Sequence, residues 1–148
     1  MNNPDCIFCK IIAGEIPSQA VYQDELLTAF HDINPVAPVH LLIVPNKHIT
    51  DNNAFSQEDE PLAGKMFSLV RKLAGDLGIA EDGYRLILNT GPHGNQVVHH
   101  LHLHLIGGHP MQHPMGVFFL PFVVQCCSVR ILEGDNTEIN LIEIFRIF

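Results

Sequence analysis

HHLHLHL, residues 99–105, alternates histidines with leucines, and this alternation decides how the rest of the chain is interpreted. Successive side chains of a β-strand point to opposite faces of its sheet. On an extended strand the leucines would therefore face a core, and the histidines would line up on the other side, with alternate Cβ atoms about 7 Å apart. The pattern predicts a row of three imidazoles, which is a stronger functional signal than an isolated histidine. Its members are His100, His102 and His104.

The composition favours one compact domain and disfavours a nucleic-acid-binding protein. The chain has 148 residues, of which 47% are hydrophobic and 16% charged, as expected for a globular protein with an ordinary core. Its formal net charge is −8, whereas proteins that grip nucleic acid neutralise phosphates with basic patches. This charge leaves open the binding of a single nucleotide in a pocket.

The two ends of the sequence carry no targeting or membrane signal. MNNPDCIFCK lacks a basic segment followed by an apolar run, and VFFLPFVV at 117–124 is too short to span a bilayer. We therefore expect a cytoplasmic protein with no membrane contact and with reduced cysteines. The C-x-x-C spacing of Cys6 and Cys9 then indicates a metal or redox role.

The order of apolar segments predicts an α+β fold with an antiparallel sheet. Strands are expected at 20–22, 26–30, 40–44, 84–89 and 99–107. Ser56 and Asp59 resemble a capping box at the start of a helix, and Gly78 ends its pattern. Apolar residues at helical spacing lie between them: Leu62, Met66, Leu69, Val70, Leu73 and Leu77.

Two kinds of chemistry fit a row of histidines. Imidazole is a common metal ligand, but three side chains on one strand converge poorly on one ion unless other elements contribute. Alternatively, a neutral imidazole whose tautomer is fixed by polar partners can attack an electrophilic centre such as phosphorus.

Longer stretches of the chain resemble a known family. HLHLHLI at 100–106 matches the signature of the histidine-triad (HIT) superfamily. The resemblance extends over roughly residues 5 to 116 and points to the Hint branch, the histidine-triad nucleotide-binding proteins and purine nucleoside phosphoramidases. The stretches that carry it are CIFCKIIAGEIPS at 6–18, AFHDINPVAPVHLLIVPNKHI at 29–49, DGYRLILN at 82–89 and the pair Gly107–Gly108.

The resemblance implies a fold and an assembly. The family fold is a five-stranded antiparallel sheet with one long helix and a short one, and two protomers join into a homodimer with a ten-stranded sheet. A HIT domain is then expected at 1–116, followed by a C-terminal extension at 117–148 of unclear structure. The apolar extension would pack on the domain, enlarge the dimer interface, or be a non-native addition.

The resemblance also implies a reaction. His102 would be the nucleophile that attacks the α-phosphorus of a nucleoside phosphoramidate, giving a nucleotidyl-histidine intermediate from which water releases AMP. His40 would lie near His100 and His104, orient the imidazole and neutralise phosphate oxygens. This chemistry requires no cofactor, and a histidine with a pKa near ~6.5 is available in its neutral, nucleophilic form.

Further residues correspond to the family's nucleotide-binding positions, and one of them departs from the pattern. Asp32 would hold the ribose hydroxyls, since a carboxylate accepts two hydrogen bonds. Where the family has Gly-Gln-Ser, this chain has valine at 97, which offers no hydroxyl to protonate a leaving amine, so activity is expected to be reduced or differently assisted. Phe8, Phe30 and Ile33 would line the purine, and Asn89, Asn95, Gln96 and Val97 would contact the phosphate and leaving group.

A zinc site is the second feature that the resemblance implies. In several relatives, two cysteines at the positions of Cys6 and Cys9 bind zinc with histidines at the positions of His48 and His100. Two thiolates and two imidazoles suit a structural tetrahedral ion. The alternative is that both cysteines are small buried residues beside the nucleotide pocket.

Two other functions stay open. A diadenosine polyphosphate hydrolase or a nucleotidyl transferase relative would share the histidine row, although the third histidine and the Gly107–Gly108 pair favour the phosphoramidase. A nucleotide-binding scaffold with vestigial activity would explain Val97 and the long apolar extension. Hydrolysis of an AMP phosphoramidate distinguishes these readings.

Overall fold

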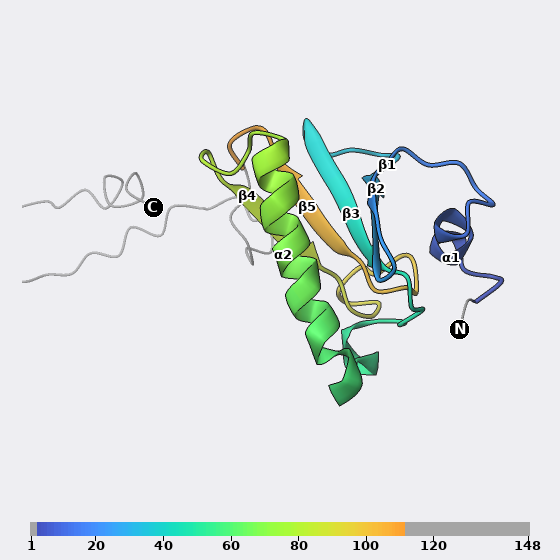
Figure 1. Cartoon of the computed structure of the whole chain (residues 1–148). Coiled ribbons are helices and arrows are strands. Elements are labelled where there is room, and N and C mark those ends of the chain that lie inside the picture. The colour runs from blue at the N-terminus through green and yellow to red at the C-terminus, as the bar shows by residue number, and fades with distance from the viewer. Residues whose placement is uncertain (1–2, 112–148) are drawn as a thin grey trace, which may run out of the picture. The chain divides into compact units, whose positions relative to one another are not determined.

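A five-stranded antiparallel sheet organises the part of the chain that the structure, a computed structural model, describes: residues 3–111 (Figure 1). The strand order is β1-β2-β3-β5-β4, which confirms the predicted α+β fold with one long and one short helix. In chain order the elements are α1 (Ile7–Ile12), β1 (Ala20–Gln23), β2 (Leu27–His31), β3 (Val39–Pro45), two 3₁₀ turns (Asn52–Ala54 and Gln57–Asp59), α2 (Glu60–Asp76), β4 (Tyr84–Leu88) and β5 (Leu103–Gly107).

The central strand β3 contributes side chains to two separate hydrophobic cores. Leu41 and Ile43 pack into a cluster with the apolar side of α2, whereas Leu42 and Val44 pack into a second cluster with α1. This division follows from the alternation of side chains along a strand. Figure 1 shows the long helix α2 lying over one side of the sheet, with α1 at the far end of the sheet near β2. Each helix therefore covers its own face.

The helix α2 forms where the capping pattern predicts. The hydroxyl of Ser56 donates to Asp59, whose carboxylate also accepts the backbone N–H of Ser56, at 2.7 and 3.2 Å. The buried residues of α2 are those at helical spacing, Met66, Leu69, Val70, Leu73 and Ala74, so the stripe read from the sequence faces the sheet. Beyond the helix, Gly78 adopts a φ of 68°, a left-handed conformation that glycine accepts without strain.

The histidine segment differs from the single long strand expected at 99–107. Only Leu103–Gly107 pairs as β5, and residues 99–102 approach the sheet without joining its ladder. There the backbone N–H of Leu101 donates to the carbonyl of Ile49 at 2.6 Å. The leucines nevertheless all lie in the core under α2, as predicted. The histidines thus face the side of α1, but only His104 belongs to a regular strand.

The short helix α1 brings its own apolar side to the histidine side of the sheet. Phe8 and Cys9 of α1 and the preceding Cys6 are buried with Phe30 of β2 and Leu42 of β3. None of the helices within residues 3–111 is long and apolar enough to cross a membrane. The predicted extension at 117–148 lies outside the described residues.

Candidate active site and metal centre

The three histidines of the row have three different hydrogen-bond environments, and that of His102 fixes its tautomer. Its Nδ1 lies 2.6 Å from the backbone carbonyl oxygen of His100, in a buried position. Because a carbonyl only accepts, Nδ1 carries the proton and donates it. The Nε2 atom of a neutral His102 therefore keeps a free lone pair. This is the form in which an imidazole acts as a nucleophile.

A series of hydrogen bonds that begins at a backbone N–H links His40 to His104. The N–H of Val36 donates to Nδ1 of His40 at 3.3 Å, so the proton of a neutral His40 lies on Nε2. From there it is donated to Nδ1 of His104, 2.9 Å away. His104 in turn carries its proton on Nε2, which is the one buried side-chain nitrogen or oxygen within residues 3–111 that has no hydrogen-bond partner. A buried donor without a partner is a ready contact for a bound anion.

Burial favours the uncharged forms of these imidazoles. It lowers the pKa of His100 and of His104 to about 4, and it lowers the pKa of His40 and of His102 as well. Neighbouring imidazoles add to the effect on His104, while Asp32 opposes it. All four histidines are thus expected to be neutral at pH 7, and the lone pair of His102 is available for attack.

Two predicted purine-contacting residues border His102, the predicted nucleophile. The ring of Phe8 meets the His102 ring edge to face, with centroids 5.2 Å apart, and it meets the ring of Phe30 at 5.5 Å. Both phenylalanines are buried. Ile33, predicted beside them, is 91% exposed. Contact with a purine stays a prediction for all three residues.

Asp32 lies at the end of β2, beside the histidine chain. One carboxylate oxygen accepts the backbone N–H of Asn34 at 2.8 Å, which stabilises the turn before Asn34–Pro35. The other lies 3.5 Å from Nε2 of His40. The side chain is 18% exposed, so it remains accessible to a ligand. Asp32 therefore both stabilises a turn and offers an acceptor at the mouth of the site.

The loop before the histidine segment, which was predicted to contact the phosphate and leaving group, is held by the side chain of Gln96. This side chain is buried, and its amide donates to the carbonyls of Thr50 and Val98 at 2.7 and 3.1 Å. Its oxygen accepts the N–H of Gly91 at 3.0 Å. These bonds fix the loop, and the role of Gln96 at a phosphate stays a prediction.

The other residues predicted in this region have accessible side chains. Asn95 is exposed and has a φ of 56°, a left-handed conformation that asparagine tolerates. Val97 is 81% exposed and Asn89 is half-buried. Their roles at a phosphate stay predictions.

The predicted zinc ligands converge on one point. The ligand atoms of Cys6, Cys9, His48 and His100 all lie within 4.8 Å of one another. His100 Nδ1 is 3.4 Å from Cys6 Sγ, 3.6 Å from Cys9 Sγ and 3.3 Å from His48 Nδ1. A tetrahedral zinc ion with ordinary bond lengths requires about 3.6 Å between sulfur and nitrogen and about 3.3 Å between nitrogens. The four residues fit such an ion.

The chemistry of the donor atoms agrees with this geometry. Nε2 of His100 donates to the carbonyl oxygen of Pro45 at 2.9 Å, which leaves the Nδ1 lone pair directed at the cluster. Burial raises the pKa of the Cys9 thiol, so a thiolate there calls for a nearby cation. The predicted alternative, two buried cysteines without a metal, leaves this convergence of lone pairs unexplained.

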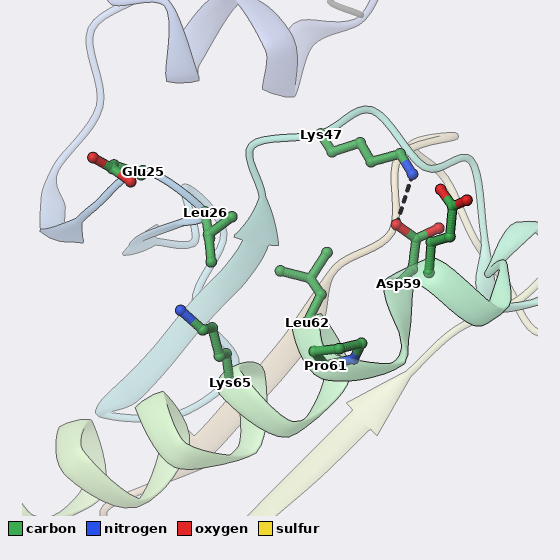
Figure 2. A pocket seen from close by; sticks show the side chains of 8 residues that line it. Glu25, Leu26, Lys47, Asp59, Pro61, Leu62 and Lys65 are labelled. Atoms are coloured by element: carbon green, nitrogen blue, oxygen red, sulfur yellow. Dashed lines mark hydrogen bonds and ion pairs between the residues drawn. The ribbon is translucent and has the colours of Figure 1, made fainter.

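A separate cavity lies away from the histidines. Figure 2 shows a pocket of about 250 Å³ between the start of α2 and the loops that flank β2 and β3. Leu26 and Leu62 supply its apolar lining, and the ammonium of Lys47 pairs with Asp59 at 2.6 Å. None of the predicted site residues lines it. The candidate active site is therefore the histidine cluster.

A sequence profile described as the HIT domain matches residues 13–111. The chain belongs to the HIT family. It is 55% identical to the purine nucleoside phosphoramidase of Escherichia coli K12 over 107 residues, which cover 72% of this chain and 90% of that protein.

Solved HIT structures share this fold. The crystal structure of a HIT family hydrolase from Legionella pneumophila Philadelphia 1 superposes with a TM-score of 0.74 at 46% identity, covering 76% of this chain and all of the other. A zinc-bound histidine triad family protein from Mycobacterium smegmatis gives a TM-score of 0.61 at 28% identity, covering 70% and 74% of the two chains. The HIT membership predicted from the histidine row is thus confirmed.

The contacts that give this HIT site its tautomers were not predicted. The carbonyls of Pro45 and His100 and the N–H of Val36 are backbone groups, so no side-chain pattern indicates them. Phe8 was expected beside the purine, but its contact with the ring of the nucleophile was not. The one signal that could have placed Phe8 near the histidines is the zinc ligand set that the resemblance implied, since Cys6 and Cys9 flank Phe8 and His100 is in the same set.

Proposed function

We propose that this chain is a HIT-type hydrolase that cleaves the P–N bond of nucleoside phosphoramidates and releases AMP. The observation that carries the proposal is the 2.6 Å contact of His102 Nδ1 with the His100 carbonyl, which leaves Nε2 free to attack phosphorus. The identity of 55% to a protein named purine nucleoside phosphoramidase supports the choice of substrate.

In the proposed reaction, the Nε2 lone pair of His102 forms a bond to the α-phosphorus while the P–N bond to the amine breaks. The amine leaves with its electron pair and takes up a proton. A water molecule then attacks the nucleotidyl-histidine, transfers a proton away, and returns neutral His102 with AMP. Dividing the displacement into two steps is the general advantage of covalent catalysis.

Neighbouring groups have distinct tasks in this proposal. The unpartnered Nε2–H of His104 is a donor for a non-bridging phosphate oxygen, and His40 keeps that proton in place through Nδ1 of His104. Asp32 accepts from the ribose hydroxyls. Phe8, Phe30 and Ile33 contact the base, and Asn89, Asn95 and Val97 border the phosphate and leaving group.

We further propose that Cys6, Cys9, His48 and His100 hold a structural zinc ion. The ion supplies no chemistry to the reaction, since four protein ligands leave no open position for water. Its contribution is to join α1 to the segment that carries the histidines. The zinc-bound HIT protein of Mycobacterium smegmatis supports this assignment, as do the distances given above.

The decisive experiment is steady-state hydrolysis of an adenosine 5′-phosphoramidate by the wild type and by His102→Ala. The variant should lose activity by at least about a thousandfold, because the nucleophile itself is removed. His109→Ala, at an exposed histidine, is the matched control and should keep full activity. An active His102→Ala would contradict the proposal.

The same proteins test the other functions. A wild type that prefers diadenosine polyphosphates would indicate the dinucleotide hydrolase. A wild type that binds AMP without turning over either substrate would indicate a nucleotide-binding scaffold, for which the exposed Val97 is the favouring observation.

A further inference from the structure

A second convergence of donor atoms lies inside the candidate active site. The ligand atoms of Asp32, His40 and His104 lie within 4.8 Å of one another. They come from the end of β2, from β3 and from β5, and they share no residue with the Cys–His cluster. Two imidazoles and a carboxylate are a common ligand set for divalent transition metals.

The distances are close to those of a coordinated ion. His40 Nε2 is 2.9 Å from His104 Nδ1 and 3.5 Å from Asp32 Oδ2. In a tetrahedral zinc site with ordinary bond lengths, each of these pairs would be about 3.3–3.4 Å apart. Shifts of a few tenths of an ångström would therefore accommodate an ion, and its fourth position would be open to water.

One proton occupies the centre of this set. It lies on Nε2 of His40 and is donated to His104 Nδ1, and Asp32 Oδ2 lies 3.5 Å from the same nitrogen. An ion can take its place only if the proton of His40 moves to Nδ1, which now accepts the N–H of Val36. That bond is 3.3 Å long and Val36 is 68% exposed, so the N–H can turn to water at low cost.

We propose that Asp32, His40 and His104 form a second metal site, which binds Zn²⁺ and excludes nucleotides while it is occupied. The ion takes the position of this proton, and the proton moves to His40 Nδ1, so no proton is released overall. Asp32 Oδ2 then coordinates the ion instead of accepting from a ribose hydroxyl. The site is therefore inhibitory, and it is separate from the structural ion proposed for the cysteines.

The experiment isolates this site in the full chain by removing the other one. Zinc titration of the Cys6→Ser/Cys9→Ser variant should give one equivalent, and adding Asp32→Asn should abolish it. Asp82→Asn, the same chemical change at an exposed residue of a turn, should leave that equivalent in place. If the cysteine variant does not fold, the wild type serves instead: two equivalents are expected, and one in Asp32→Asn.

A spectroscopic measurement adds a readout that weak binding to surface histidines would not produce. The amide resonance of Val36 should shift only with the second equivalent of zinc, and its hydrogen exchange should become faster. A wild type that binds one equivalent, or a second equivalent that survives Asp32→Asn, overturns the inference. AMP should bind only before the second equivalent of zinc is added, and AMP binding that persists with this equivalent overturns the exclusion of nucleotides. Hydrolysis, which tests the proposed function, is measured separately without the second equivalent.

Discussion

At the scale of single residues, position 97 is where this chain differs most from the family pattern that it otherwise follows. An exposed valine replaces the residue expected to carry a hydroxyl. The Nε2–H of His104, which is buried and unpartnered within residues 3–111, belongs to a neutral imidazole and can donate a hydrogen bond but not a proton to a leaving amine. We expect this chain to hydrolyse substrates with good leaving groups better than simple alkyl amines.

Val97→Ser tests that interpretation. General acid catalysis is typically worth about 10²–10⁴-fold, so an added hydroxyl should raise kcat for an alkyl phosphoramidate by at least about tenfold. The side chain is 81% exposed, so the exchange should leave stability unchanged. The measurement is kcat for a series of amines of different basicity. Val97→Ala, which lacks the hydroxyl, is the matched control, and an equal rise there would refute the acid role.

At the scale of elements, the loop before the histidine segment depends on one amide. Gln96 bonds the carbonyls of Thr50 and Val98 and the N–H of Gly91. Gln96→Ala would leave these backbone groups without partners, at a cost of about 1–3 kcal/mol in unfolding free energy. Urea denaturation measures this loss of unfolding free energy. Gln57→Ala, at an exposed glutamine, should change stability by less than roughly 0.5 kcal/mol.

The start of α2 gives a pH-dependent prediction. The bond from Lys47, with those from Ser56, lowers the pKa of Asp59 to about 2. A carboxyl group with a lowered folded-state pKa stabilises the protein above its unfolded-state pKa of about 3.9, and this contribution disappears as the pH falls toward about 2. Asp59→Asn should therefore lower Tm at pH 6. It should also reduce the decrease in Tm that occurs between about pH 3.9 and about pH 2. Thermal unfolding at a series of pH values measures both effects, and an unchanged slope would argue against the pair.

The elements show how far sequence reasoning could go. The α2 stripe and its capping box were predictable because both depend on local spacing, and so were the leucines of the histidine segment. The late start of β5 was not, because the hydrogen bond from Leu101 to Ile49 that replaces the ladder joins residues far apart in the chain. Gln96 illustrates the same limit: its buried partners are backbone groups, which have no signature in the sequence.

At the scale of the whole molecule, we propose that residues 1–116 form the HIT domain by themselves and that 117–148 are an extension. Within residues 3–111, the buried members of the two cores run from Cys6 to Leu105. A chain ending at Gly116 should fold with an unfolding free energy within roughly 0.5 kcal/mol of the full chain. A fragment that fails to fold would show that the extension packs on the domain.

Assembly belongs to the same scale. We propose the homodimer that the family resemblance implies, in which the sheets of two protomers join. Sedimentation of the full chain and of the fragment ending at Gly116 measures the assembly state. If the fragment is still a dimer, the extension is not the main interface. If the full chain is a dimer and the fragment is a monomer, the interface lies in the extension.

The bond from His102 to the carbonyl of His100 passes through the main chain, and this has an evolutionary consequence. Any residue at position 100 supplies the same carbonyl. The metal ligands can therefore change by mutation while the acceptor that orients the nucleophile is inherited unaltered. The proposed metal ligand His100 and the proposed nucleophile His102 are neighbours along the chain, yet natural selection can act on one of these functions without first rebuilding the other.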